Sequence, residues 1–162
     1  VCEWMGRLAE EGRFQVDRDT FAAMRELFTG DWVSNDDALA TVRRVFDETG
    51  YLMDPHTAVA WEVAERTVGE DPILVVSTAH WAKFAADVLR ALTGTPAAEA
   101  LPEEFAQMSG VELLGEVRRL AGDTCACIPE PLAELDGLEV RFDGIIDAGH
   151  TGVEDVVRAW LA

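Results

Sequence analysis

Apolar residues recur every three to four positions along most of the chain, a spacing that predicts amphipathic helices. The first such stripe ends at Gly12, and a second follows the candidate capping residues 17–19 and is expected to end at Gly30. The polar run 34–37 predicts the start of a third helix, which Gly50 would close. The apolar stripe of this third helix consists of Leu39, Val42, Val45 and Phe46.

One short run has the pattern of a buried strand. Residues 73–76 are apolar on both faces, which is typical of a central strand in a mostly parallel sheet. Residues 138–142 alternate between apolar and polar side chains and predict a second strand with one exposed face. We therefore predict an α/β, helix-rich fold with one central strand and a few short strands. Because one strand cannot form a sheet, its neighbours are expected to lie outside this chain.

The character of the sequence changes after residue 94, where a Gly-Thr-Pro turn ends the helix that follows the strand. The three predicted parts are a main body at residues 1–94, a helical insertion or linker at residues 95–137, and a closing strand and helix at residues 138–162. Within the linker, short helices are expected near 103–108 and 111–120. The closing helix is expected at 153–161.

The net charge excludes several classes of partner. The 162 residues include 31 acidic and 13 basic side chains, a formal charge of −18 that disfavours nucleic acids and anionic lipid surfaces. No apolar run approaches the roughly 18 residues of a membrane span, and no signal peptide is evident. Cys2, Cys125 and Cys127 lack the spacing of a zinc site or a disulfide framework, so we expect no metal and a reducing, cytoplasmic location.

Asp54-Pro55-His56-Thr57 is the first candidate for a functional site. In a structural interpretation, Asp54 is a helix N-cap and Pro55 is the first helical residue. In a functional one, free N–H groups, the Thr57 hydroxyl and a neutral His56 at a helix N-terminus form a generic site for a phosphate or a carboxylate. The residues alone leave both interpretations open.

Ser77-Thr78-Ala79-His80 follows the predicted strand directly and is the second candidate. In open α/β sheets, ligands bind beyond the carboxyl ends of the strands, so two hydroxyls and His80 would lie where a cofactor binds. Either hydroxyl can hydrogen-bond a ring nitrogen, and either can instead cap the helix that follows. Lys83 is the only lysine and a candidate for Schiff-base formation, whereas a solvated helix lysine is the commoner case.

Both candidate segments resemble signature motifs of threonine synthases, in the same order. Residues 50–58, Gly-Tyr-Leu-Met-Asp-Pro-His-Thr-Ala, are similar to the family's Gly-Tyr-Leu-x-Asp-Pro-His-Thr/Ser-Ala motif. Residues 77–84 resemble its Thr-Ala-His-Pro-Ala-Lys-Phe motif, with Trp81 in place of the proline that would fix the first helical turn. The likeness is specific over residues 1–92 and loose over 93–162, and it is to the C-terminal portion of the family.

The resemblance implies a pyridoxal 5'-phosphate (PLP) enzyme of fold type II. Such an enzyme converts O-phospho-L-homoserine and water into L-threonine and phosphate, a step of amino-acid biosynthesis. By the same resemblance, Thr78 would face the pyridine nitrogen of PLP, with Ser77 as the second choice. The residues expected beside the cofactor or the substrate phosphate, or at the edge of that pocket, are His80, Lys83, Asp54, His56 and Thr57.

The resemblance also implies that this chain is a fragment of a lyase. The Schiff-base lysine and the Gly-rich phosphate loop belong to the family's N-terminal half, so no catalytic residue is assigned here and the chain alone is expected to be inactive. Exposed strand edges would then lead to self-association, or to dependence on the N-terminal half as a partner. The alternative is a free-standing threonine-synthase-like domain that binds a ligand or a partner without catalysis.

Overall fold

Helices are the regular secondary structure of the described part of the chain. The computed structural model describes residues 1–162 except 68, 70, 123–125, 140–149 and 162. The elements in chain order, with η for a 3₁₀ helix, are α1 (Cys2–Glu11), α2 (Arg18–Leu27), α3 (Asn35–Thr49), α4 (Pro55–Arg66), η1 (Trp81–Phe84), α5 (Ala85–Thr93), α6 (Gly110–Ala121), α7 (Glu130–Ala133), η2 (Glu134–Gly137) and α8 (His150–Leu161).

The N-terminal helices begin and end at residues suited to those positions. Asp17 and Ser34 cap α2 and α3, because their side-chain oxygens accept hydrogen bonds from first-turn N–H groups that have no partner within the helix. Gly12 and Gly50 close α1 and α3 in the left-handed conformation, with φ of 71° and 74°. Glycine adopts that conformation without the steric cost that a Cβ atom brings.

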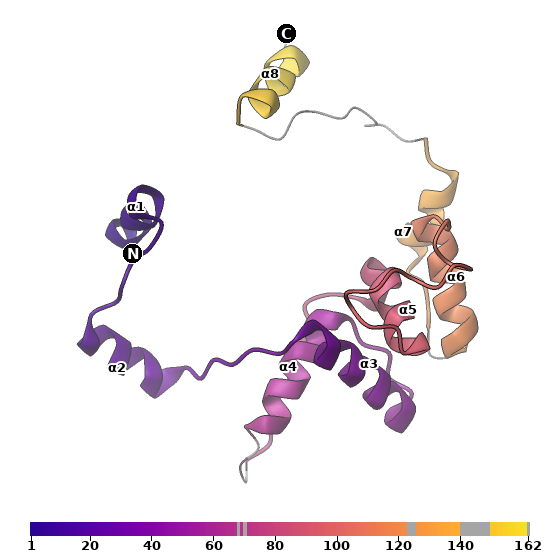
Figure 1. Cartoon of the computed structure of the whole chain (residues 1–162), viewed down its shortest axis with the longest axis horizontal. Helices are drawn as coiled ribbons and strands as arrows, with labels where there is room; N and C mark the ends of the chain where they lie inside the picture. Colours follow the sequence, from indigo (N-terminus) through magenta and orange to yellow (C-terminus); the bar gives the residue numbers. More distant parts are fainter. Residues whose placement is uncertain (68, 70, 123–125, 140–149, 162) are drawn as a thin grey trace.

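The apolar core lies between α3, α5 and α6. Helix α5 packs against both α3 and α6, while α4 packs against α3 (Figure 1). The predicted stripe of α3 is buried except for Phe46, which is partly buried at the edge of the core. The largest fully buried apolar side chains are those of Met53, Leu89, Val42, Val45, Val88 and Val117. Residues of α6 belong to the same apolar cluster. The predicted division of the chain into residues 1–94, 95–137 and 138–162 stays a prediction.

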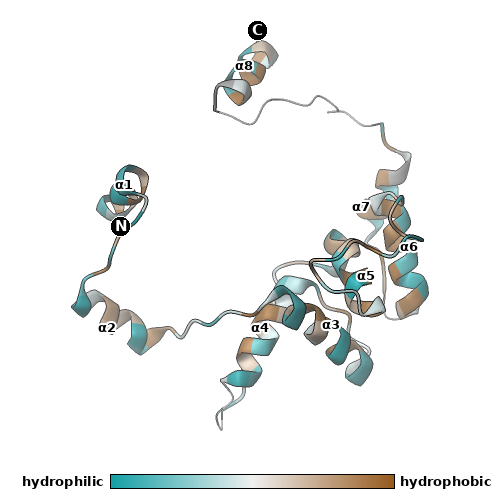
Figure 2. Ribbon diagram, viewed as in Figure 1, coloured by the Kyte–Doolittle hydropathy of each residue, from teal (hydrophilic) through white to brown (hydrophobic). Residues whose placement is uncertain are grey.

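Helices α1 and α2 lie outside this core. Neither contains a buried residue, and Figure 1 shows both leading away from the N-terminal end of α3. Figure 2 shows apolar positions on each of them, and Leu27 of α2 is 80% exposed. Trp4 of α1 stacks on Phe14 with ring centroids 6.0 Å apart. The apolar stripes of the two helices therefore face solvent.

The central strand predicted at residues 73–76 is not formed in this chain. No described residue is in a strand, and Leu74 and Val76 are 87% and 66% exposed. A strand exists only where a neighbour supplies hydrogen-bond partners for its backbone, and no segment of the described chain supplies them here. The second strand, predicted at 138–142, falls largely on residues 140–142, which lie outside the described residues.

Some helices also differ from those predicted, and the closing helix α8 begins at His150 rather than at residue 153. Helix α2 ends at Leu27 rather than at Gly30, because the next residue has an extended backbone (φ −128°, ψ 134°). Residues 103–108 form successive turns instead of a helix, beginning with the Phe105 N–H, which donates to the Pro102 carbonyl at 2.8 Å. Phe105 is nevertheless 3% exposed, so one aromatic side chain anchors these turns to the core.

The core packing predicts a large effect of truncation at Leu89, a fully buried residue of α5. We expect Leu89→Ala to lower the free energy of unfolding by about 3 kcal/mol, since it removes buried methyl groups and leaves a cavity. Urea unfolding followed by tryptophan fluorescence measures the change. The control is Leu74→Ala, at a site 87% exposed, where we expect less than about 0.5 kcal/mol. Equal losses in the two variants would contradict this account of the core.

The contact between α3 and α4 predicts a dependence of stability on pH. Hydrogen bonding from Arg44, 2.5 Å from the Glu65 carboxylate, lowers the pKa of Glu65 below its ordinary value near 4.5. A lowered pKa in the folded state stabilises the protein above the unfolded pKa, and the contribution is lost as pH falls through the folded value. Both side chains are more than a third exposed, so the contribution is below about 1 kcal/mol.

We therefore expect Glu65→Gln to lower the urea midpoint at neutral pH, and the difference from the unsubstituted chain to shrink as pH falls through the lowered pKa of Glu65. Glu48→Gln is the matched control, because Glu48 lies 3.7 Å from the same guanidinium and should give a smaller difference. A difference for Glu65→Gln that persists unchanged at low pH would show that its origin is not the ion pair.

Candidate functional site

The two segments that resemble family motifs lie side by side. Thr57 Oγ1, in the first turn of α4, is 3.0 Å from Ser77 Oγ. Thr57 is buried and Ser77 is exposed, so the contact reaches from the protein interior to its surface. The N-terminus of α4 and the segment 77–80, which precedes η1, are thereby brought together although they are twenty residues apart.

Asp54 caps α4 from within the protein, where its side chain is 1% exposed. Oδ1 accepts hydrogen bonds from the backbone N–H groups of His56 at 2.9 Å and Thr57 at 3.3 Å. Oδ2 accepts from the Thr57 hydroxyl at 2.5 Å. Pro55 occupies the first turn, where its missing N–H costs no hydrogen bond. The structural interpretation of Asp54 as an N-cap is therefore correct, and both carboxylate oxygens have partners within the chain.

Ser77 and Thr78 differ in their surroundings. Ser77 Oγ is close to Thr57 and also 3.1 Å from the carbonyl oxygen of Ala79, so it has two neighbours inside the chain. Thr78 is exposed, and its hydroxyl has no hydrogen-bond partner among the described residues. Of the two hydroxyls considered for a ring nitrogen, that of Thr78 is the one left available to a ligand.

His80 has one ring nitrogen occupied and one available. It is the N-cap of η1, because Nδ1 accepts a hydrogen bond from the Ala82 N–H at 3.2 Å. An Nδ1 that accepts requires the proton of the neutral ring to be on Nε2. The neighbouring Trp81 is 3% exposed, with its ring 5.4 Å from that of His80. The tryptophan that replaces the family proline is therefore fixed by the core.

His56 and Lys83 lie at the surface. The His56 side chain is 64% exposed, and its Nδ1 is 3.4 Å from Asp54 Oδ1. Its ring also packs against Phe84, with centroids 4.7 Å apart. Lys83 is exposed on η1 and makes no ion pair with another described residue. Its backbone N–H donates to the His80 carbonyl at 3.0 Å, so its position relative to His80 is fixed.

Two small cavities flank these residues. The first has a volume of about 320 Å³ and is lined by Gly50, Tyr51, Leu52, Met53, Asp54, Ala79, His80, Trp81 and Cys127. The second, of about 290 Å³, is lined by Asn35, Ala38, Leu39, Pro55, His56, Val59, Phe84, Asp87 and Ala97. Asp54 and His80 therefore share one cavity and His56 lines the other. Ser77, Thr78, Thr57 and Lys83 line neither. Sequence analysis gave no indication that Cys127 would reach the first cavity.

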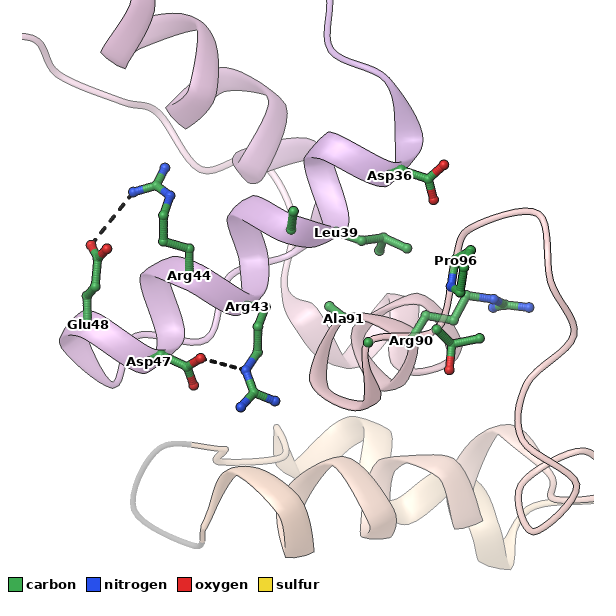
Figure 3. A pocket seen from close by; sticks show the side chains of 12 residues that line it. Asp36, Leu39, Arg43, Arg44, Asp47, Glu48, Arg90, Ala91 and Pro96 are labelled. Atoms are coloured by element: carbon green, nitrogen blue, oxygen red, sulfur yellow. Dashed lines mark hydrogen bonds and ion pairs between the residues drawn. The ribbon is translucent and has the colours of Figure 1, made fainter.

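A larger cavity, of about 700 Å³, lies between α3 and α5 (Figure 3). Its lining includes two ion pairs along α3, Arg43 with Asp47 at 2.6 Å and Arg44 with Glu48 at 3.7 Å. Arg43 also donates to the Leu92 carbonyl of α5. None of the predicted site residues lines this cavity, and its arginines are already paired within the chain. Volume alone therefore does not identify the candidate site.

The described residues contain neither a cluster suited to a metal ion nor a helix suited to span a membrane. No group of three or more His, Cys, Asp or Glu side chains is arranged to hold a metal ion there. Cys2 and Cys127 are free and exposed, while Cys125 lies outside the described residues. No helix in the ranges described has both the length and the apolar composition to cross a bilayer.

Known proteins match this chain over a region that includes the second motif. Residues 57–119 match the family model for the C-terminal region of threonine synthase. The threonine synthase of Saccharomyces cerevisiae is 34% identical over 122 residues, which are 67% of this chain and 24% of the yeast protein. Threonine synthase-like 1 of Homo sapiens is 36% identical over 93 residues, 57% of this chain and 12% of the human protein.

The fold matches as well. A PLP-bound threonine synthase from Brucella melitensis superposes with a TM-score of 0.52 and 27% identity, covering 74% of this chain and 27% of that one. Sequence and fold together define the chain as a relative of threonine synthases. The part of the family that it matches is the C-terminal portion, so the resemblance inferred from the two motifs is confirmed. The chain spans between 12% and 27% of the length of these relatives.

The buried setting of the Asp54 cap predicts that loss of this side chain destabilises the protein more than loss of an exposed helix cap does. Asp54→Ala leaves two N–H groups and the Thr57 hydroxyl without their acceptor in a buried site. We expect a loss of about 3 kcal/mol in the free energy of unfolding of the core, combining the cap and the unsatisfied groups. Urea unfolding measures it.

Asp17→Ala is the matched control, because Asp17 accepts from the Thr20 N–H at 2.9 Å and the Thr20 hydroxyl at 2.8 Å in the same arrangement on an exposed helix. We expect this variant to leave the unfolding of the core unchanged. A similar loss for both aspartates, or none for Asp54→Ala, would argue against a special role of the buried cap.

Proposed function

We propose that this chain supplies the C-terminal wall of the PLP site of a threonine synthase, a lyase. In the protein that carries it, O-phospho-L-homoserine and water become L-threonine and phosphate, while the chain alone is inactive. The observation that carries the proposal is that one short segment presents two available polar groups, the Thr78 hydroxyl and the Nε2–H of His80. The similarity to threonine synthases supports it independently.

The residues present fit the ring end of PLP. A neutral hydroxyl such as that of Thr78 can donate a hydrogen bond to a pyridine nitrogen and leave that nitrogen unprotonated. Ser77 is the second candidate for the same contact. Bound PLP supplies an electron sink for carbon chemistry. The task of this chain is to hold the ring nitrogen in a neutral hydrogen bond.

The same segment supplies groups suited to a phosphate. His80 donates through Nε2–H, because its other nitrogen is held by the backbone of η1. Lys83 adds an exposed positive charge three residues further on. His56 and Thr57 shape the edge of the pocket from the first turn of α4, and Asp54 fixes that turn. These groups suit the phosphate of O-phospho-L-homoserine, the substrate that the similarity to threonine synthases suggests.

Lys83 is not assigned the role of the Schiff-base lysine. Such a lysine is activated by desolvation or by a neighbouring cation, and Lys83 is exposed on a surface turn with no cation beside it among the described residues. It is also the only lysine in the sequence. The covalent attachment point of the cofactor therefore comes from the N-terminal half that the family possesses.

Borohydride reduction with PLP tests this assignment. The 162-residue chain and the full-length protein that contains it are each mixed with PLP, reduced, digested and mapped by mass spectrometry. We expect one stoichiometric pyridoxyl adduct in the full-length protein, on a lysine outside these residues, and only sporadic labelling of the chain alone. Phosphate release from O-phospho-L-homoserine is expected for the full-length protein and not for the chain.

Lys83→Arg is the matched control, because it keeps the charge and removes the amine. We expect its full-length form to retain the stoichiometric adduct. A stoichiometric adduct on Lys83 that disappears in this variant would overturn the assignment and make the chain a PLP protein by itself. A full-length protein that binds PLP or substrate without releasing phosphate would instead support a ligand-binding domain without catalysis.

A further inference from the structure

Among the described residues, the same helix cap occurs twice, in two different settings. Asp17 with Thr20 and Asp54 with Thr57 each place an aspartate three residues before a threonine, whose N–H and hydroxyl both donate to the carboxylate. The first cap is exposed. In the second, Asp54 is 1% and Thr57 is 4% exposed, and the threonine hydroxyl also reaches Ser77 in another segment. A cap alone does not require this second contact.

We propose that Thr57 is a positioning residue, whose hydroxyl fixes the segment 77–80 against the N-terminus of α4. The expected effect of Thr57 on cofactor binding rests on the function proposed above. Thr57 acts through Ser77 and need not touch a ligand. The segment it holds carries the Thr78 hydroxyl and the His80 ring, the two groups assigned to the cofactor and the phosphate.

Counting hydrogens defines the direction of the contact. A carboxylate only accepts, so the one hydroxyl proton of Thr57 lies on the bond to Asp54. Thr57 Oγ1 also lies within hydrogen-bond distance of Ser77 Oγ, and with its proton on the Asp54 bond it accepts from the Ser77 hydroxyl through a lone pair. Ser77 has one proton for two acceptors, Thr57 Oγ1 and the Ala79 carbonyl oxygen at 3.1 Å. In either state the Ser77 proton stays inside the chain.

Burial makes the orientation of Thr57 stable. A hydrogen bond to an ionised acceptor is about twice as strong as a neutral one, and a low-dielectric interior strengthens it further. The Thr57 hydroxyl therefore cannot rotate away from Asp54 at small cost, and its lone pair faces Ser77 permanently. The pair of adjacent hydroxyls is thereby divided: Ser77 faces inward, and Thr78 is left for a ligand.

Amide hydrogen exchange of the 162-residue chain tests the proposal without any cofactor. The readout is the exchange of the Ala82 and Lys83 amides, both of which donate to His80. We expect Thr57→Val to speed their exchange about fivefold, the factor for one net hydrogen bond. Thr57→Ser keeps the hydroxyl and should stay within about twofold of the unsubstituted chain. Ser77→Ala should match Thr57→Val, and the double variant should show no further increase.

Thr20→Val is the matched control, because it removes the same cap hydroxyl from α2, where no second contact exists among the described residues. We expect it to leave the Ala82 and Lys83 amides unchanged. A purely structural role of Thr57 predicts a different pattern: faster exchange within α4 with no change at Ala82 and Lys83, or effects of Thr57→Val and Ser77→Ala that add. Either result overturns the proposal. If Thr57→Val does not fold, Ser77→Ala, at an exposed site, still decides it.

Titration of the full-length protein with PLP separates this inference from the proposed function. We expect Thr57→Val and Ser77→Ala each to raise the dissociation constant for PLP about fivefold. If the unsubstituted protein fails to bind PLP, the proposed function is wrong, and the exchange experiment alone judges Thr57. If exchange changes as expected and PLP affinity does not, the positioning role stands and the assigned contact of the segment with the cofactor fails.

Discussion

The burial of the Asp54 carboxylate is the constraint on which the candidate site depends. A carboxylate that is 1% exposed is tolerated only when hydrogen bonds replace its lost hydration, and three donors of the first α4 turn do so. These bonds fix the start of α4 and the place where Thr57 meets Ser77. The available groups on the following residues, Thr78 and His80, are therefore positioned by an interaction inside the protein.

Features with local causes could be predicted from the sequence. Asp17, Ser34 and Asp54 cap helices through bonds that span only two or three residues, and Gly50 ends α3 through its own backbone freedom. The two motif segments could also be recognised from the sequence, because each motif is defined by the order of its own neighbouring residues. The match to the C-terminal region of threonine synthase extends over residues 57–119 and includes the second motif.

Features that depend on distant partners could not be predicted in this way. The apolar run 73–76 specifies side chains, whereas a strand also needs a neighbouring backbone that the described chain does not provide. Tertiary packing brings Thr57 into contact with Ser77. It also places Cys127 in the lining of the cavity that contains His80. Trp81 is intermediate: the sequence shows that it replaces a proline, and only the fold shows that the core holds it.

The exposure of α1 and α2 has a thermodynamic consequence. Each is ten residues long and has no buried residue, and isolated helices shorter than about 12–15 residues are marginal in water. Their helicity is thus governed by a local helix–coil equilibrium, while α3, α5 and α6 melt with the core. The chain accordingly has two populations of helix with separate cooperativity, and a single melting temperature taken from its helical signal would describe neither.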